Sequence, residues 1–174
     1  MLYEEKVTEN RAAFLSAVEN ICGQLDIEPD WLMAVMNSES GLNHRAVNPN
    51  GGATGLIQFM PATAIFLGAT TAALKAMSNV EQLEYVRKYL YPYRYKIKSY
   101  ADLYMSIFFP AALGKTESWI IRASGLPAEK VASANRIFDL DSNGILTVSE
   151  VREAFLRRVP ESLRNRFRNQ VKKK

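Results

Sequence analysis

Apolar residues recur at helical spacing along most of the chain. Residues 8–25 place apolar side chains three or four positions apart, which predicts an amphipathic helix. We expect a second helix to follow Asp30, a residue type that favours N-caps, and to end near Glu39. No segment of strand length alternates convincingly between apolar and polar residues. The pattern therefore predicts an all-α fold.

Turn and capping signals divide the rest of the chain into further helices. Residues 41–55 contain Asn-Pro and Asn-Gly-Gly sequences and are expected to form a loop. Pro61 suits the first turn of the helix that follows. Ser78 and Glu81 have the spacing of a capping box, and Ser99 is a candidate cap for a later helix.

Composition limits the possible classes of protein. The 174 residues are 48% hydrophobic and 23% charged, which is typical of a globule that buries a core. We expect one main domain at residues 1–125, with residues 126–174 packed on it. The net charge is +4, and its basic residues concentrate in a C-terminal tail rather than in base-reading motifs, so no nucleic-acid partner is expected. We expect that tail to be solvated; its cations are Arg164, Arg166, Arg168, Lys172, Lys173 and Lys174.

Three local features carry smaller predictions. No apolar run approaches the length of a membrane span, so no spanning helix is expected. The first residues lack the apolar core of a signal peptide. Cys22 falls on the apolar face of the first helix and is expected in the core, whereas His44 lies in a polar loop and is expected to be exposed.

A carboxylate stands at the end of the second predicted helix. Glu39 and Ser40 come directly before the Gly- and Asn-rich loop, which returns through an apolar segment carrying Gln58. Apolar neighbours and the negative end of a helix both disfavour the ionised carboxylate. We therefore expect Glu39 to have a raised pKa and to serve as a general acid.

This stretch resembles the soluble lytic transglycosylase (SLT) domains, relatives of goose-type lysozyme. The residues that carry the resemblance are Glu39-Ser40 and then Gly55-Leu56-Ile57-Gln58-Phe59-Met60-Pro61-Ala62-Thr63-Ala64. The resemblance extends over residues 15–110 and implies a lysozyme-like fold. It also implies cleavage of the β-1,4 bond between N-acetylmuramic acid and N-acetylglucosamine in bacterial peptidoglycan. In this role Glu39 is the acid/base, and Ser40 and Gln58 orient the substrate.

The tyrosines suggest a further contact with the sugar. All of them except Tyr3 lie within residues 85–104. A tyrosine ring can stack on a sugar face, but the same rings can pack between helices. The family's Ala-Tyr-Asn-x-Gly element is absent, and Tyr104 is the best candidate to take the place of its tyrosine.

The acidic residues around Glu39 bear on the reaction. The loop from Ser40 to Gln58 contains no Asp or Glu, whereas ordinary glycosidases use two carboxylates. We therefore expect the muramoyl C6 hydroxyl to be the nucleophile, which gives a 1,6-anhydro product without water. Two alternatives stay open. The first is a hydrolytic muramidase in which Asp102 or Glu81 activates water, and the second is a catalytically silent wall-binding or virion structural protein.

A second motif fits the calcium loop of an EF-hand. Its oxygen ligands would come from Asp139, Asp141, Asn143, the Ile145 carbonyl, Thr147 and bidentate Glu150, and Gly144 would supply the sharp turn. Helical runs flank the loop, which predicts a C-terminal helix-loop-helix. Only one such loop is present, so we expect Ca²⁺ to act as a structural clip rather than a switch. No organic cofactor is expected.

The resemblance and the lack of a leader together predict a setting. The substrate would be peptidoglycan glycan strands in the cell wall or periplasm, reached after synthesis in the cytoplasm. Phage particles, lysins released through a holin and secreted effectors reach the wall in this way.

Overall fold

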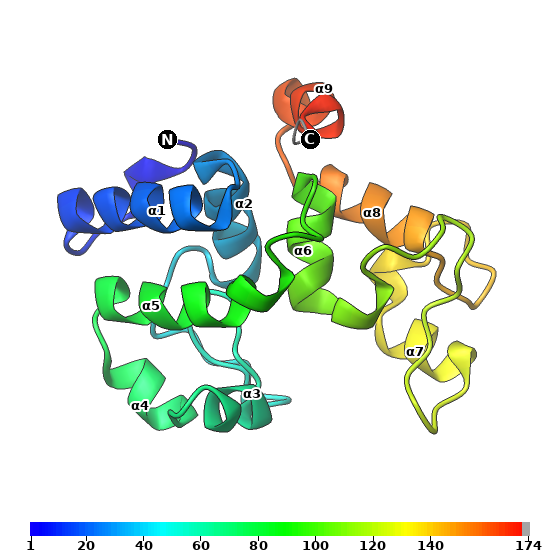
Figure 1. Cartoon of the computed structure of the whole chain (residues 1–174). Helices are drawn as coiled ribbons and strands as arrows, with labels where there is room; N and C mark the ends of the chain where they lie inside the picture. The colour runs from blue at the N-terminus through cyan, green and yellow to red at the C-terminus, as the bar shows by residue number, and fades with distance from the viewer. Residues whose placement is uncertain (172–174) are drawn as a thin grey trace. The chain divides into compact units, whose positions relative to one another are not determined.

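The computed structural model describes residues 1–171, and Lys172–Lys174 of the predicted basic tail lie outside the described residues. The chain is mostly helical, and residues 1–171 form isolated bridges but no strand, which confirms the all-α prediction. It divides into two compact units, Met1–Tyr95 and Lys96–Lys174 (Figure 1). This boundary differs from the expected one near residue 125, because the helix that begins at Tyr100 packs against helices of the later segment.

The N-terminal unit (Met1–Tyr95) is built on helix α1, which packs against α2 and α5 (Figure 1). Its core contains the fully buried side chains of Phe14, Leu25, Trp31 and Leu83. The helices are α1 (Arg11–Leu25), α2 (Pro29–Ser40), α3 (Pro61–Phe66), α4 (Thr71–Ala76) and α5 (Asn79–Leu90), with 3₁₀ turns η1 (Glu4–Lys6) and η2 (Tyr91–Tyr93).

The helix ends of this unit follow local capping rules, with one departure from expectation. Ser78 and Glu81 form the predicted capping box at the start of α5. Asp30 is not the N-cap of α2, because Pro29 already occupies the first helical turn and Glu28 is the N-cap. The Asp30 carboxylate instead accepts a hydrogen bond from the Leu2 backbone N–H at 2.8 Å, which ties the N-terminus to α2.

The C-terminal unit, which begins at Lys96, has a core of aromatic rings. The rings of Tyr104 and Phe155 stack with centroids 4.0 Å apart, and Phe138 packs edge-on to Phe155. The helices are α6 (Tyr100–Phe108), α7 (Ala128–Ala134), α8 (Val148–Arg157) and α9 (Glu161–Asn169), with 3₁₀ turns η3 (Pro110–Ala112) and η4 (Arg136–Phe138). Helix α9 corrects the expectation of a solvated tail in part: Phe167 is only 1% exposed and packs on Tyr100, whereas Arg166 and Arg168 are exposed as expected.

Three smaller predictions have clear outcomes. No helix in residues 1–171 has both the length and the apolar character that crossing a bilayer requires. Cys22 is in the core as predicted, and burial raises the pKa of its thiol to about 12. The expectation that His44 is exposed is wrong, since the residue is only 5% exposed. The turn after α2 folds back toward α5, where the His44 carbonyl accepts a hydrogen bond from Gln82.

Candidate active site

Helix α2 places Glu39 at its C-terminal end. Every residue from Trp31 to Met36 is buried, whereas the last turn, which contains Glu39, is half-buried. Gly41 ends the helix in the left-handed conformation, with φ of +64°, and its N–H bonds to the Asn37 carbonyl at 2.9 Å. Glu39 is thus held in the last turn of a buried helix, at the partly accessible end where the helix dipole is negative.

Ser40 links this end of the helix to the returning loop. Its hydroxyl lies 3.0 Å from the Met36 carbonyl of its own helix and 3.0 Å from the Leu56 carbonyl. The hydroxyl has one proton, which these two acceptors share. The structure therefore gives Ser40 a bridging role beside Glu39, and its direct contact with substrate stays a prediction.

The loop from Gly41 to Phe59 is closed by its own hydrogen bonds. The Gly55 N–H bonds to the Ala46 carbonyl at 2.9 Å, and Thr54 and Phe59 exchange two backbone bonds of 3.0 and 2.8 Å. Loops that carry functional side chains need such fixed geometry, because an unpaired backbone would be free to move. The Gly- and Asn-rich sequence thus folds into a defined scaffold.

Gln58 is at the tip of this scaffold, in the left-handed region with φ of +54°. Its side-chain nitrogen donates to the Gly55 carbonyl at 3.0 Å and to the Ala46 carbonyl at 3.4 Å. The side-chain N–H groups are therefore used inside the loop. Gln58 is half-buried, and its predicted contact with substrate is not tested by this geometry.

Sequence reasoning missed Gln82, which lies on α5 and is completely buried. Its side-chain oxygen accepts a hydrogen bond from the Leu56 N–H at 2.6 Å, and its nitrogen donates to the carbonyls of His44 and Leu74, each at 2.9 Å. The available signal was a polar residue beside the apolar face of a capped helix. That signal does not reveal which loop the side chain holds.

Tyr104 belongs to the C-terminal unit, whereas Glu39, Ser40 and Gln58 belong to the N-terminal one. The Tyr104 ring stacks on Phe155 and its hydroxyl accepts a hydrogen bond from Arg158. The residue is 1% exposed, so its ring and hydroxyl already have contacts within the unit. A contact between Tyr104 and a sugar stays a prediction.

The two acids considered for a hydrolytic reaction both have structural partners. Glu81 accepts hydrogen bonds from the Ser78 backbone and hydroxyl, each at 2.8 Å, and these bonds hold the pKa of Glu81 below its usual value. Asp102 accepts bonds from the Lys98 N–H and the Ser99 hydroxyl, and it forms an ion pair with Arg152.

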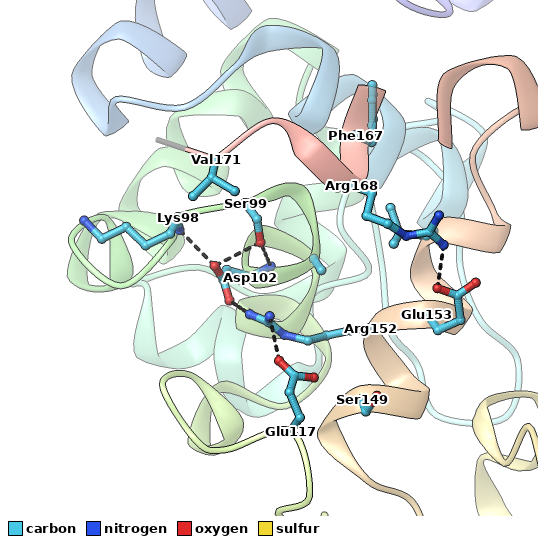
Figure 2. Close-up of a pocket in the computed structure, with 12 residues that line it drawn as sticks. Lys98, Ser99, Asp102, Glu117, Ser149, Arg152, Glu153, Phe167, Arg168 and Val171 are labelled. Atoms are coloured by element: carbon cyan, nitrogen blue, oxygen red, sulfur yellow. Dashed lines mark hydrogen bonds and ion pairs between the residues drawn. The ribbon is translucent and has the colours of Figure 1, made fainter. Parts of the chain in front are cut away.

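Figure 2 shows these Asp102 contacts within a cavity of about 480 Å³ in the C-terminal unit. Arg152 also reaches Glu117 at 3.1 Å, and Arg168 pairs with Glu153 at 2.8 Å. The two arginines are therefore matched by acids of the same unit. This arrangement suits an ion-pair network that joins α6 and α8, and it gives no support to Asp102 as an activator of water.

The predicted calcium loop brings three of its acidic residues close together. Asp139, Asp141 and Glu150 each offer a carboxylate oxygen, and these oxygens lie within 4.8 Å of one another. The backbone N–H groups of Asn143 and Gly144 both bond to the Asp139 carboxylate at 3.1 Å, so the loop curls around it. The donor set is all oxygen, which is the chemistry that Ca²⁺ prefers.

The two oxygens of Glu150 have different environments. Oε2 accepts bonds from the Thr147 N–H and hydroxyl, at 3.0 and 2.7 Å, and so caps α8. Oε1 is buried and has no hydrogen-bond partner within residues 1–171. Burial opposes ionisation of Glu150, but the hydrogen bonds with Thr147 and then with Asp141 outweigh it and keep its pKa below the usual value. A charged carboxylate with one unpaired buried oxygen fits a cation ligand.

The second half of this loop is also fixed by pairing with an earlier segment. The Ile121 N–H bonds to the Leu146 carbonyl at 2.8 Å, and the Val148 N–H bonds to the Trp119 carbonyl at 3.0 Å. An isolated antiparallel bridge joins Ile120 to Thr147. The 3₁₀ turn η4 precedes the loop and α8 follows it, while α7 already ends at Ala134; the EF-hand itself stays a prediction.

With this geometry in place, comparison with known families finds a match for part of the N-terminal unit. Residues 17–85 match the family model of the transglycosylase SLT domain. The SLT match includes Glu39, Ser40, Gln58 and Gln82, whereas Tyr104 and the predicted calcium loop lie outside it. Searches of curated proteins and of solved structures each found no match.

The SLT match implies a transglycosylase that acts on peptidoglycan in the cell wall. It agrees with the resemblance found in the motifs. It does not assign the acid, the product or the setting.

Proposed function

We propose that the protein is a lytic transglycosylase that cleaves the N-acetylmuramic acid–β-1,4–N-acetylglucosamine bond, with Glu39 as acid and then base. The observation that carries the proposal is the place of Glu39. It ends a buried helix, it is half-buried, and Ser40 beside it is bonded to the loop that carries Gln58. All three residues lie within the SLT match.

The chemistry follows from one carboxylate and the substrate's own hydroxyl. Glu39 protonates the glycosidic oxygen as the C1–O bond breaks, and N-acetylglucosamine leaves with that proton. The resulting carboxylate then takes the proton of the muramoyl C6 hydroxyl, whose oxygen bonds to C1. Glu39 is protonated again, and the product is a 1,6-anhydro sugar. General acid–base help of this kind is typically worth about 10²–10⁴-fold in rate.

Release of soluble muropeptides from purified cell walls tests this assignment. Glu39→Gln keeps the shape of the side chain but cannot donate and retrieve a proton, so release should fall by about 10²-fold or more. The matched control is Glu19→Gln on the exposed face of α1, which should act like the wild type. Near-normal release by the Glu39 variant would refute the assignment.

The alternatives receive less support. A hydrolytic muramidase needs a second acid, and both Glu81 and Asp102 are engaged in helix caps and an ion pair. The presence of both Glu39 and Gln58 counts against a silent wall-binding or virion structural protein, which would need neither. The phage or holin setting stays a prediction, because neither the fold nor the SLT match bears on it.

The loop of residues 139–150 is proposed as a structural Ca²⁺ site. Asp139, Asp141 and Glu150 would supply carboxylate oxygens, Asn143 and Thr147 side-chain oxygens, and Ile145 its carbonyl. The unpaired Oε1 of Glu150 and the close carboxylates support the proposal. The bound cation would neutralise the repulsion among the acids and add stability, with no part in the chemistry at Glu39.

A further inference from the structure

The side chain of Gln82 does more than fill space in the core, because it also forms hydrogen bonds. It is completely buried on α5, and its amide makes three hydrogen bonds to the backbone. The oxygen accepts one bond and the nitrogen donates two, so both N–H groups of the amide are used. A buried polar group with this many partners fixes the segments that it joins.

Those partners come from three separate segments of the N-terminal unit. His44 lies in the turn after α2, Leu56 in the returning part of the loop and Leu74 on α4. The loop backbone runs directly against the amide. A Cβ atom added at Gly55 would lie 2.3 Å from the Gln82 oxygen, so the close approach requires glycine there.

The hydrogen bonds continue from Leu56 to Ser40, the residue next to Glu39. Gln82 holds the N–H of Leu56, while the carbonyl of the same residue accepts a bond from the Ser40 hydroxyl. Ser40 follows Glu39 in the last turn of α2, and Gln58 is two residues beyond Leu56. One side chain on α5 therefore fixes the residue through which the loop is joined to the end of α2.

From this arrangement we infer that Gln82 is a positioning residue, which sets the loop bearing Gln58 against the helix end bearing Glu39. The inference rests on the proposed function, because the geometry that it preserves is that of the acid and the substrate-binding loop. Small displacements of reacting groups are costly, since a shift of about 1 Å can lower the rate about 10²-fold.

The test compares Gln82→Met with Leu83→Ala. The first keeps the size of the side chain and removes all three hydrogen bonds. The second is the matched control. Leu83 is the next residue of α5 and is fully buried, and its apolar side chain cannot form hydrogen bonds with the loop. Gln82→Glu is a second variant, which keeps an acceptor for Leu56 and, even when burial protonates it, retains at most one of the two donors.

Two readouts separate positioning from stability. Below the melting temperature, Gln82→Met should lower kcat on purified cell walls by about 10- to 100-fold with KM within about threefold. Leu83→Ala should lower the melting temperature and leave kcat unchanged. Amide hydrogen exchange needs no activity, and it should speed up across residues 44–58 in Gln82→Met but not in Leu83→Ala.

Each outcome is decisive. Wild-type kcat and wild-type exchange in folded Gln82→Met would overturn the inference, as would equal losses of kcat in the two variants. Wild-type protein that releases no muropeptides would instead refute the proposed function. The exchange measurement would then still decide whether Gln82 holds the loop.

Discussion

Replacing Glu150 with glutamine should remove the response of the protein to calcium. In the loop, three carboxylate oxygens lie within 4.8 Å of one another. At an effective dielectric constant of about 20, two unit charges at that distance repel by about 3.5 kcal/mol. Asp141 is exposed, so screening by water reduces the repulsion of its pairs to about 1 kcal/mol. A divalent cation reverses the sign of these interactions.

The expected gain can be stated as a melting temperature. If the loop binds calcium as proposed, a hundredfold excess of calcium over its Kd should stabilise the folded protein by about 2.7 kcal/mol. For a chain of this length, 1 kcal/mol corresponds to about 2–4 °C, so the melting temperature should rise by about 5–11 °C. Magnesium should have a much smaller effect, because it demands octahedral geometry and gives up its water reluctantly.

The assay is thermal unfolding followed by circular dichroism in CaCl₂, in MgCl₂ and in EDTA. Glu150→Gln retains an oxygen that can cap Thr147 but lacks the charge, so its melting temperature should not change with calcium. Glu153→Gln is the matched control on the same helix, because it removes surface ion pairs with Arg157 and Arg168 and leaves the loop intact. A wild-type melting temperature that is equal in CaCl₂ and EDTA would refute the reasoning, as would a calcium-induced rise in Glu150→Gln.

Three further predictions concern the N-terminal unit. Gly55→Ala should destabilise the protein by about 2–4 kcal/mol in urea unfolding, because the added Cβ would lie 2.3 Å from the Gln82 oxygen and residue 55 has a φ of +86°. A loss below about 0.5 kcal/mol would contradict this packing. Burial, followed by the positive charge of Arg45, holds the pKa of His44 below its usual 6.5. The contribution of neutral His44 to stability is therefore complete above pH 6.5 and is lost as the pH falls. His44→Gln should flatten the fall in urea stability between pH 7.5 and about 5.5, and an unchanged slope would count against it. The Ser78 bonds lower the pKa of Glu81 from 4.5, so Glu81→Gln should destabilise the protein at pH 7 and have little effect near pH 2.5; equal losses at both pH values would show that the charge does not matter.

Local patterns predicted the elements that bury a clear apolar face or carry a cap. Helix α5 was found through its capping box, and α2 through the apolar run that ends at Glu39. Helix α9 was missed because its sequence is dominated by charged and polar residues and only Phe167 is buried. Helix α4, which Thr70 caps, was missed because it buries only Leu74 and, unlike α3, has no proline in its first turn.

The candidate site was likewise predicted only in part from the sequence. Glu39 and Gln58 were predicted because their motif pieces lie close together along the chain, and the SLT match covers both; their roles stay predictions. The role of Gln82 could not be read from the sequence, since it arises only when folding brings His44, Leu56 and Leu74 to one side chain. The prediction that His44 is exposed was wrong for the same reason, because tertiary contacts bury this part of a loop whose sequence is polar.

The most direct test of the central claim is mass spectrometry of the sugars released from purified cell walls digested in ¹⁸O-labelled water. If Glu39 serves as acid and then base while the muramoyl C6 hydroxyl closes on C1, the wild type should release 1,6-anhydro ends without label, and Glu39→Gln should release almost none. Reducing ends that carry ¹⁸O would contradict the account, because they would show that water attacks C1.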